Sequence, residues 1–241
     1  AFANLFGLGG APLCAMARGK GNREGAQGIM VNAGFMLLLS GAVLTVLGIV
    51  FHRPLLYLFG ASEVTYPYAS SYIVIYLIGT LCVMLSLGLN PYINCQGFAR
   101  TGMLTVALGA AANIVLDPIF IFALHLGVRG AAIATVLSQF LSAAWVVKFL
   151  TGKKAELKLD FRGFRPDRQC IQRITVLGIA SFVMSFTDTL VQVACNATLR
   201  NFGGDLYISV MTVLNSVRQI AQTPVLAIAD GASTAISYNY G

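Results

Sequence analysis

Runs of about 20 or more mostly apolar residues recur along this 241-residue chain. Coiled as an α-helix, a run of that length crosses the hydrocarbon core of a bilayer, about 30 Å thick. Only 10% of the residues are charged, against about 25% in typical soluble domains, which excludes a soluble globular fold and a disordered chain. The period of two that is typical of membrane barrel strands is absent. The sequence therefore predicts an all-α integral membrane protein, a polytopic helical bundle.

Seven apolar segments are predicted, most of them about 20–30 residues long, as suits tilted membrane helices. The chain does not begin with Met, and both of its ends lie inside apolar stretches, so we expect an internal fragment of a longer membrane protein. The predicted segments are Ala1–Ala17, Gly28–Val50, Pro67–Pro91, Met103–Leu124, Gly130–Leu150, Ile174–Leu199 and Tyr207–Tyr238.

Basic residues are distributed unevenly among the connectors between these segments. Twelve of the 16 Lys and Arg residues lie in one alternate set of connectors or, like Lys148, at a segment end beside it; three lie in the other set, and Arg218 lies deep inside an apolar segment. Lys and Arg concentrate on the cytoplasmic side of membrane proteins, so the richer set is expected to be cytoplasmic. This predicts a multi-pass protein of the plasma membrane, of the bacterial inner-membrane type, with the lipid bilayer as its partner and no nucleic acid.

The longest connector, Thr151–Arg173, is basic and divides the chain. We expect residues 1–150 to form a first helical bundle, 151–173 a cytoplasmic linker, and 174–241 the start of a second bundle. An alternative for the linker is a basic surface that rests on anionic lipid.

Four stretches with matching spacing resemble the multidrug and toxic compound extrusion (MATE) transporters. The resemblance implies a two-lobe, pseudo-symmetric fold of which this chain holds helices two to eight, so that the first bundle lacks its first helix. It also implies an antiporter that exports drug-like, often cationic organic compounds in exchange for Na⁺ or H⁺. We expect the full-length protein to be a monomer. The stretches are Pro12–Asn22 (PLCAMARGKGN), Asn113–Phe122 (NIVLDPIFIF), Gly127–Thr135 (GVRGAAIAT) and Ile236–Gly241 (ISYNYG).

Asp117 lies inside an apolar segment, where a charge costs about 2.5–3.5 kcal/mol on insertion scales. Asn113 comes four residues earlier and shares its helical face, and Thr135 is expected at similar depth on the next, antiparallel helix. Their oxygen atoms suit Na⁺, and a carboxyl there can also titrate. The family resemblance places a cation-coupling site, and with it a possible Na⁺ ion, at these three residues; the alternative is that Asp117 is a packing residue.

Asn90 and Asn94 form another pair four residues apart, at the inner end of the third segment. They either line the same bundle interior and join the cation-coupling set, or hydrogen-bond to loop backbone at the helix end.

Asp188 and Arg218 are the charged residues of the second bundle that most need a partner, and their equal depth permits an ion pair. The resemblance offers a rival role for Asp188, because some members of the family use an acid near this place for cation coupling. Further polar side chains accompany the two, among them Gln192 and Gln222.

Two other classes of function compete with the antiporter. A lipid-linked saccharide flippase would share the two-bundle architecture but is expected to need several intramembrane bases to meet pyrophosphate. A membrane enzyme would need a cluster of acid, base and nucleophile, and the isolated His52 and His125 do not supply one. We therefore expect no catalytic residue, no enzyme activity and no cofactor other than the coupling ion.

Overall fold

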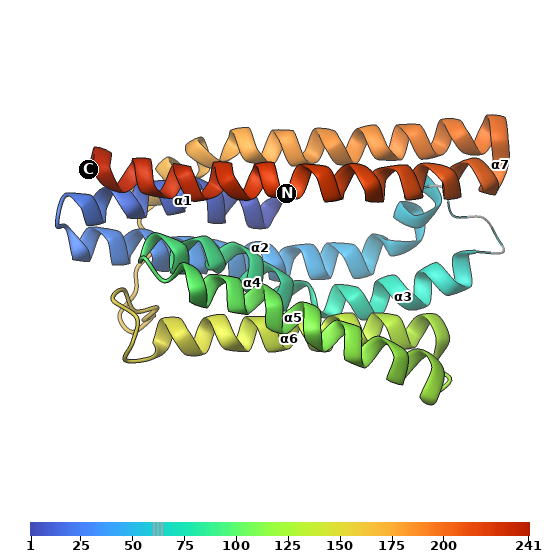
Figure 1. Ribbon diagram of the computed structural model, residues 1–241, viewed down its shortest axis with the longest axis horizontal. Helices are drawn as coiled ribbons and strands as arrows, with labels where there is room; N and C mark the ends of the chain where they lie inside the picture. Colours follow the sequence, from blue (N-terminus) through green and yellow to red (C-terminus); the bar gives the residue numbers. More distant parts are fainter. Residues whose placement is uncertain (60, 62, 64) are drawn as a thin grey trace.

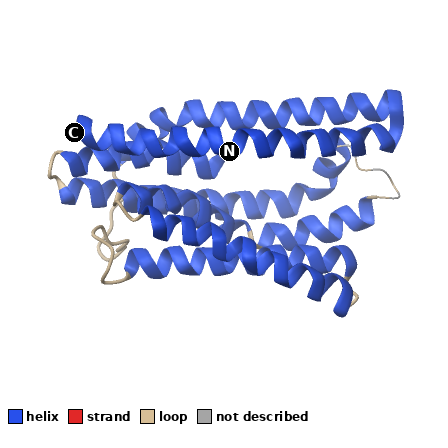
Figure 2. Cartoon of the chain, in the orientation of Figure 1, coloured by secondary structure: helices blue, strands red, loops and turns tan. Residues whose placement is uncertain are grey.

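The structure is a computed structural model. It describes residues 1–241 except 60, 62 and 64, and within α7 the side chains of 200–206 and 208 are also not described. The described part is helical, and no strand occurs in it (Figures 1 and 2). The elements are α1 (Phe2–Gly19), α2 (Arg23–Leu58), α3 (Tyr66–Ile78), α4 (Thr80–Cys95), α5 (Ala99–Pro118), a π-helical turn η1 (Ile119–Ala123), α6 (Gly127–Thr151) and α7 (Arg168–Tyr240).

The helices have the length and surface of membrane-spanning segments. Among the described residues, four helical stretches are long and apolar enough to cross a bilayer, namely α2, α5 with η1, α6 and the first 32 residues of α7. Large apolar side chains such as Ile114, Phe122 and Ile220 are at least 70% exposed, which a soluble protein rarely tolerates over so wide a surface. The predicted class, an all-α integral membrane bundle, is confirmed.

Two predicted boundaries are wrong. The segment predicted over Pro67–Pro91 is a bent pair, α3 and α4, whose axes differ by 55° across Gly79. Residues His52–Pro54, expected to be a connector, lie inside α2, which continues through Pro54 to Leu58. At a rise of about 1.5 Å per residue, the 36 residues of α2 exceed the hydrocarbon thickness, so its last turns extend beyond it.

The long helix α7 doubles back on itself, and its two arms run side by side along the bundle (Figure 1). The first arm corresponds to the predicted segment Ile174–Leu199 and the second to Tyr207–Tyr238. The connector predicted between them, Asn201–Asp205, lies within α7, whose helical assignment continues through these residues, and its side chains are not described. Among the described residues, α7 packs against α1, α2 and α4 and not against α3, α5 or α6.

Helix α1 contacts α2, α4 and both arms of α7. Its glycines allow this close approach: a Cβ on Gly9 would collide with the backbone of Ile174 and Gly178 in the first arm of α7. On the other side of α1, the buried Tyr92 of α4 donates its phenolic hydrogen to the Phe6 carbonyl at 2.7 Å. The buried core of the described molecule lies mainly between α1, α2 and α4, and Ile174 of α7 joins it.

Arg18, near the C-terminal end of α1, links three elements. Its guanidinium donates to the Cys95 carbonyl at the end of α4 and forms an ion pair with Glu156 in the linker. It also lies 5.6 Å from the ring centroid of Tyr238, near the end of α7. Arg23 reaches the same Glu156 carboxylate at 3.5 Å but remains exposed. Arg18 therefore ties the first bundle to both the linker and α7.

Candidate functional site

Helices α5 and α6 pack through small residues, which lets two polar side chains of α5 face α6. Ser142 of α6 donates its hydroxyl hydrogen to the Thr105 carbonyl at 3.1 Å. Thr105 and Gly109 are buried on α5, and Asn113 and Asp117 continue the same stripe at steps of four residues. Small residues at such an interface let membrane helices approach and leave room for polar groups between them.

Asn113 and Asp117 contact each other directly. The Asn113 Nδ2 atom donates to Asp117 Oδ1 at 3.3 Å, and both side chains are partly buried. Helix α5 ends at Pro118, and the five-residue π-helical turn follows at once. Pro118 has no N–H for the Ile114 carbonyl, and π-helical turns are frequent at functional sites. The carboxylate thus lies where the helical hydrogen bonding of α5 is interrupted.

Thr135 lies at the level of this pair on the neighbouring helix. Two contacts define how α5 and α6 align: Ser142 reaches Thr105, and Gly130 packs on the Phe120 backbone. Interpolation between them places Thr135 level with Asn113 and about one turn from Asp117. Its hydroxyl donates to the Ala131 carbonyl of its own helix at 2.8 Å, a bond that a cation ligand can keep, because the hydroxyl oxygen retains acceptor capacity.

The structure places Asn90 and Asn94 apart from these three residues. Both asparagines lie on α4 beside Gly102, near the N-terminal end of α5. Gly102 precedes Asp117 by 15 residues, or about 22 Å along the helix axis. Within the described residues, Asn90 Oδ1 is buried without a hydrogen-bond partner. The five residues predicted as one cation-coupling set therefore form two groups at different depths.

A polar contact between α4 and α6 was missed by the sequence reasoning. Ser86 donates its hydroxyl hydrogen to Gln139 Oε1 at 2.9 Å, within the bundle. Gln139 lies one turn beyond Thr135 on α6, toward Thr151. In the sequence it is the single Gln of the predicted segment Gly130–Leu150. It extends the polar groups of the first bundle from the level of Asn113 toward the linker.

In α7 the structure brings Asp188 and Arg218 together from the two arms of the helical hairpin. Arg218 Nη2 lies 3.9 Å from Asp188 Oδ1, and the two side chains are 59% and 63% exposed, respectively. Gln192 and Gln222 are exposed on the same two arms. These four residues form a polar face on the hairpin that the described part of the chain leaves uncovered.

Asp117 is the one acidic residue in the group that it forms with Asn113 and Thr135. Among the described residues, no three His, Cys, Asp or Glu side chains converge as a transition metal would require. One carboxylate, one amide, one hydroxyl and a backbone carbonyl instead form a hard-oxygen set of low charge, as suits a monovalent cation or a proton.

The chain is similar to known proteins along its whole length and to a family profile over residues 1–119. The MatE family profile matches residues 1–119. Over 240 residues the chain is 26% identical to the multidrug export protein MepA of Staphylococcus haemolyticus (strain JCSC1435), covering 100% of this chain and 53% of that protein. With MepA of Staphylococcus aureus (strain MRSA252) the identity is 21%, over 98% of this chain and 52% of that protein. The chain thus spans about half the length of the curated relatives it matches.

Solved structures show the same fold. The outward-facing conformation of a multidrug resistance MATE family transporter of the MOP superfamily superposes with a TM-score of 0.87 at 27% identity, covering 99% of this chain and 54% of that one. A MOP superfamily transporter from Pyrococcus furiosus gives a TM-score of 0.86 at 26% identity, covering 98% and 52%. The arrangement of α1 to α7 therefore matches a segment that makes up about half the length of these transporters.

Proposed function

We propose that this chain, which belongs to the MATE family of membrane transporters, is a segment of a secondary active exporter of drug-like organic compounds. Its relatives carry the name multidrug export protein, and two of the matched structures are of multidrug resistance transporters. Export of a compound against its concentration gradient needs an energy source. If an ion gradient is that source, the chain must offer a group whose charge the ion can change.

The observation that supports this function is the Asn113–Asp117 pair inside the first bundle. The neighbour of the carboxylate is a neutral amide that donates one hydrogen bond, so the charge of Asp117 is not balanced by a base there. A bound Na⁺ ion or a proton would balance it. Asp117, Asn113, Thr135 and the Ile114 carbonyl would hold the ion, and its arrival would favour one arrangement of the two lobes over the other.

The proposed function also includes an orientation of the chain in the membrane. The long basic linker and the inner end of α1 would lie on the cytoplasmic side of the plasma membrane, because most Lys and Arg residues of the connectors lie there. Asp117 would then lie in the outer half of the bundle, near the turn at His125, where ions enter from outside.

A saccharide-lipid flippase is the alternative with the same architecture, and one observation weighs against it. Arg218, a base deep inside a predicted apolar segment, is paired with Asp188. The charge of Arg218 is thereby compensated, whereas recognition of pyrophosphate requires bases whose charge is not already compensated.

The test uses the full-length parent protein in proteoliposomes, with a fluorescent organic cation as substrate. An inward Na⁺ gradient and a pH gradient are imposed in separate experiments. Export driven by either gradient supports the proposal and identifies the coupling ion. Export driven by neither gradient, from protein that is folded and reconstituted, would contradict it.

A further inference from the structure

The linker between α6 and α7 is held firmly on the first bundle. Ala155, Leu157 and Leu159 alternate with exposed residues, and their side chains are 8% exposed or less. The Leu157 N–H donates to Gln96 Oε1 at 2.9 Å, and the Leu159 N–H donates to the Leu150 carbonyl at 2.9 Å. This part of the linker therefore lies as an extended strap with one apolar side inward.

The second part of the linker is anchored to α2. The rings of Phe164 and Phe35 lie 5.6 Å apart between centroids, and the Asp167 N–H donates to Asn32 Oδ1 at 3.0 Å. Asn32 is buried although it lies in an apolar helix, and this bond gives its amide oxygen a partner. The linker is thus attached to the bundle at both ends, so that one set of its side chains faces the bundle and another set faces outward.

That outward side is basic, and its acids are already engaged. Glu156 pairs with Arg18 and Arg23, whereas Asp160 and Asp167 accept hydrogen bonds from the backbone N–H groups of Arg162 and Gln169. The outward bases, which we call the basic rim, are all exposed, and within the described part of the chain no ion pair involves them. The rim consists of Lys153, Lys154, Lys158, Arg162, Arg165 and Arg168.

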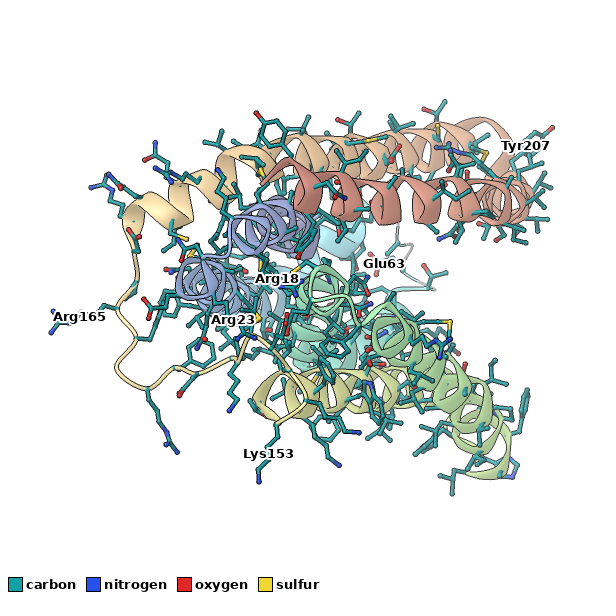
Figure 3. The ribbon with its side chains drawn as sticks, turned by 60° about the vertical axis from the view of Figure 1, so that its left-hand side comes forward. Arg18, Arg23, Glu63, Lys153, Arg165 and Tyr207 are labelled. Carbon is teal, nitrogen blue, oxygen red and sulfur yellow. The ribbon has the colours of Figure 1, made fainter. Side chains whose placement is uncertain are left out.

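We propose that the basic rim binds the headgroups of anionic phospholipids. The linker joins the end of α6 at Thr151 to the start of α7 at Arg168, so the rim lies at the level of the helix ends, where headgroups lie. Figure 3 shows Lys153 and Arg165 pointing away from the bundle. Juxtamembrane bases at this level attract anionic lipid. The proposal takes its membrane geometry from the proposed function, but lipid binding does not require transport.

The experiment compares two double variants of the full-length parent in nanodiscs that contain phosphatidylcholine and phosphatidylglycerol. Arg162→Gln with Arg165→Gln removes two charges from the rim. The matched control, Arg53→Gln with Arg129→Gln, removes two exposed charges at the opposite end of the bundle. Native mass spectrometry measures how strongly each protein retains phosphatidylglycerol over phosphatidylcholine.

We expect the rim variant to lose about tenfold or more of its preference for phosphatidylglycerol, while the control keeps the parent's preference. Raising the ionic strength should reduce the parent's preference toward that of the rim variant, because exposed charges are screened. Equal preference in all three proteins would overturn the proposal and favour an acidic protein as the partner of the rim. Export activity of the same variants is measured separately, so a failure of the transport proposal is distinguishable.

Discussion

The first bundle and the α7 hairpin each contain an acid within an apolar helix, Asp117 and Asp188 respectively, and the surroundings of these two acids differ. Asp117 is partly buried against α6 and receives a hydrogen bond from a neutral amide. Asp188 is exposed and faces Arg218 from the other arm of the hairpin. The carboxylate of the first bundle keeps an unbalanced charge, whereas the one in the hairpin has a counter-charge within its own element.

A coupling acid and a structural acid can be distinguished by the charge of their partners. An acid that has a permanent cationic partner gains little from binding a further cation, whereas an acid that has only neutral donors gains much. We infer that Asp117 is the coupling residue and that the Asp188–Arg218 pair maintains the hairpin. The predictions below test this assignment.

The largest effect is expected from Asp117→Asn. The substitution is nearly isosteric and removes the charge, so the full-length protein should fold and insert, while ion-driven efflux from vesicles falls by about tenfold or more. Asn113→Ala and Thr135→Ala should reduce it less, because each removes one neutral ligand. Asp160→Asn, an exposed acid of the linker, is the control and should leave efflux unchanged. Parent-level efflux by Asp117→Asn would leave Asp117 as a packing residue.

A smaller effect, on folding rather than on coupling, is expected in the hairpin. Asp188→Asn leaves Arg218 without a counter-charge, which costs at most about 2.5–3.5 kcal/mol on insertion scales. We expect a lower yield of folded full-length protein, measured by size-exclusion chromatography after mild solubilisation. Adding Arg218→Gln should restore that yield. If the single variants fold at normal yield but lose transport, the comparison is reversed and Asp188 takes the coupling role.

The smallest effect concerns the link between the two regions. Arg18→Gln removes contacts to Cys95, Glu156 and Tyr238, and hydrogen bonds of charged groups contribute about 1.5–3 kcal/mol each. Arg23→Gln is the matched control, because its ion pair with Glu156 is exposed and such pairs contribute about 0–1 kcal/mol. Thermal unfolding of the full-length protein should shift downward for Arg18→Gln by several degrees more than for Arg23→Gln. Equal shifts would show that Arg18 does not join the regions.

Much of this fold could be predicted from the sequence, because apolar runs of bilayer length and the distribution of bases carry strong signals. The helical class followed from those runs alone. The break at Gly79 and the continuation of α2 through Pro54 could not be read in the same way. A glycine or a proline permits a bend without requiring it, and packing against neighbouring helices decides the outcome.

The candidate site was predictable to the extent that residues lie on one helix. Asn113 and Asp117 are four residues apart, so helical geometry alone brings them together. Asn90 and Asn94 lie on another helix, and their distance from Asp117 depends on how α4 packs against α5, which no local pattern encodes. Gln139 was overlooked because a single amide in an apolar segment is not informative until its partner, Ser86, is known.

The strap formed by the linker also bears on how the protein is made. Gln96, which receives the Leu157 N–H, precedes it by 61 residues, and both are synthesised before any residue of α7. Chains leave the ribosome from the N-terminus, and their parts begin to fold in that order. The inner surface of the first bundle can therefore close while the hairpin is still being translated. Asp167, which directly precedes α7, can already be held beside α2 by its bond to Asn32 when α7 emerges, so the order of translation itself helps to place the second half of the molecule.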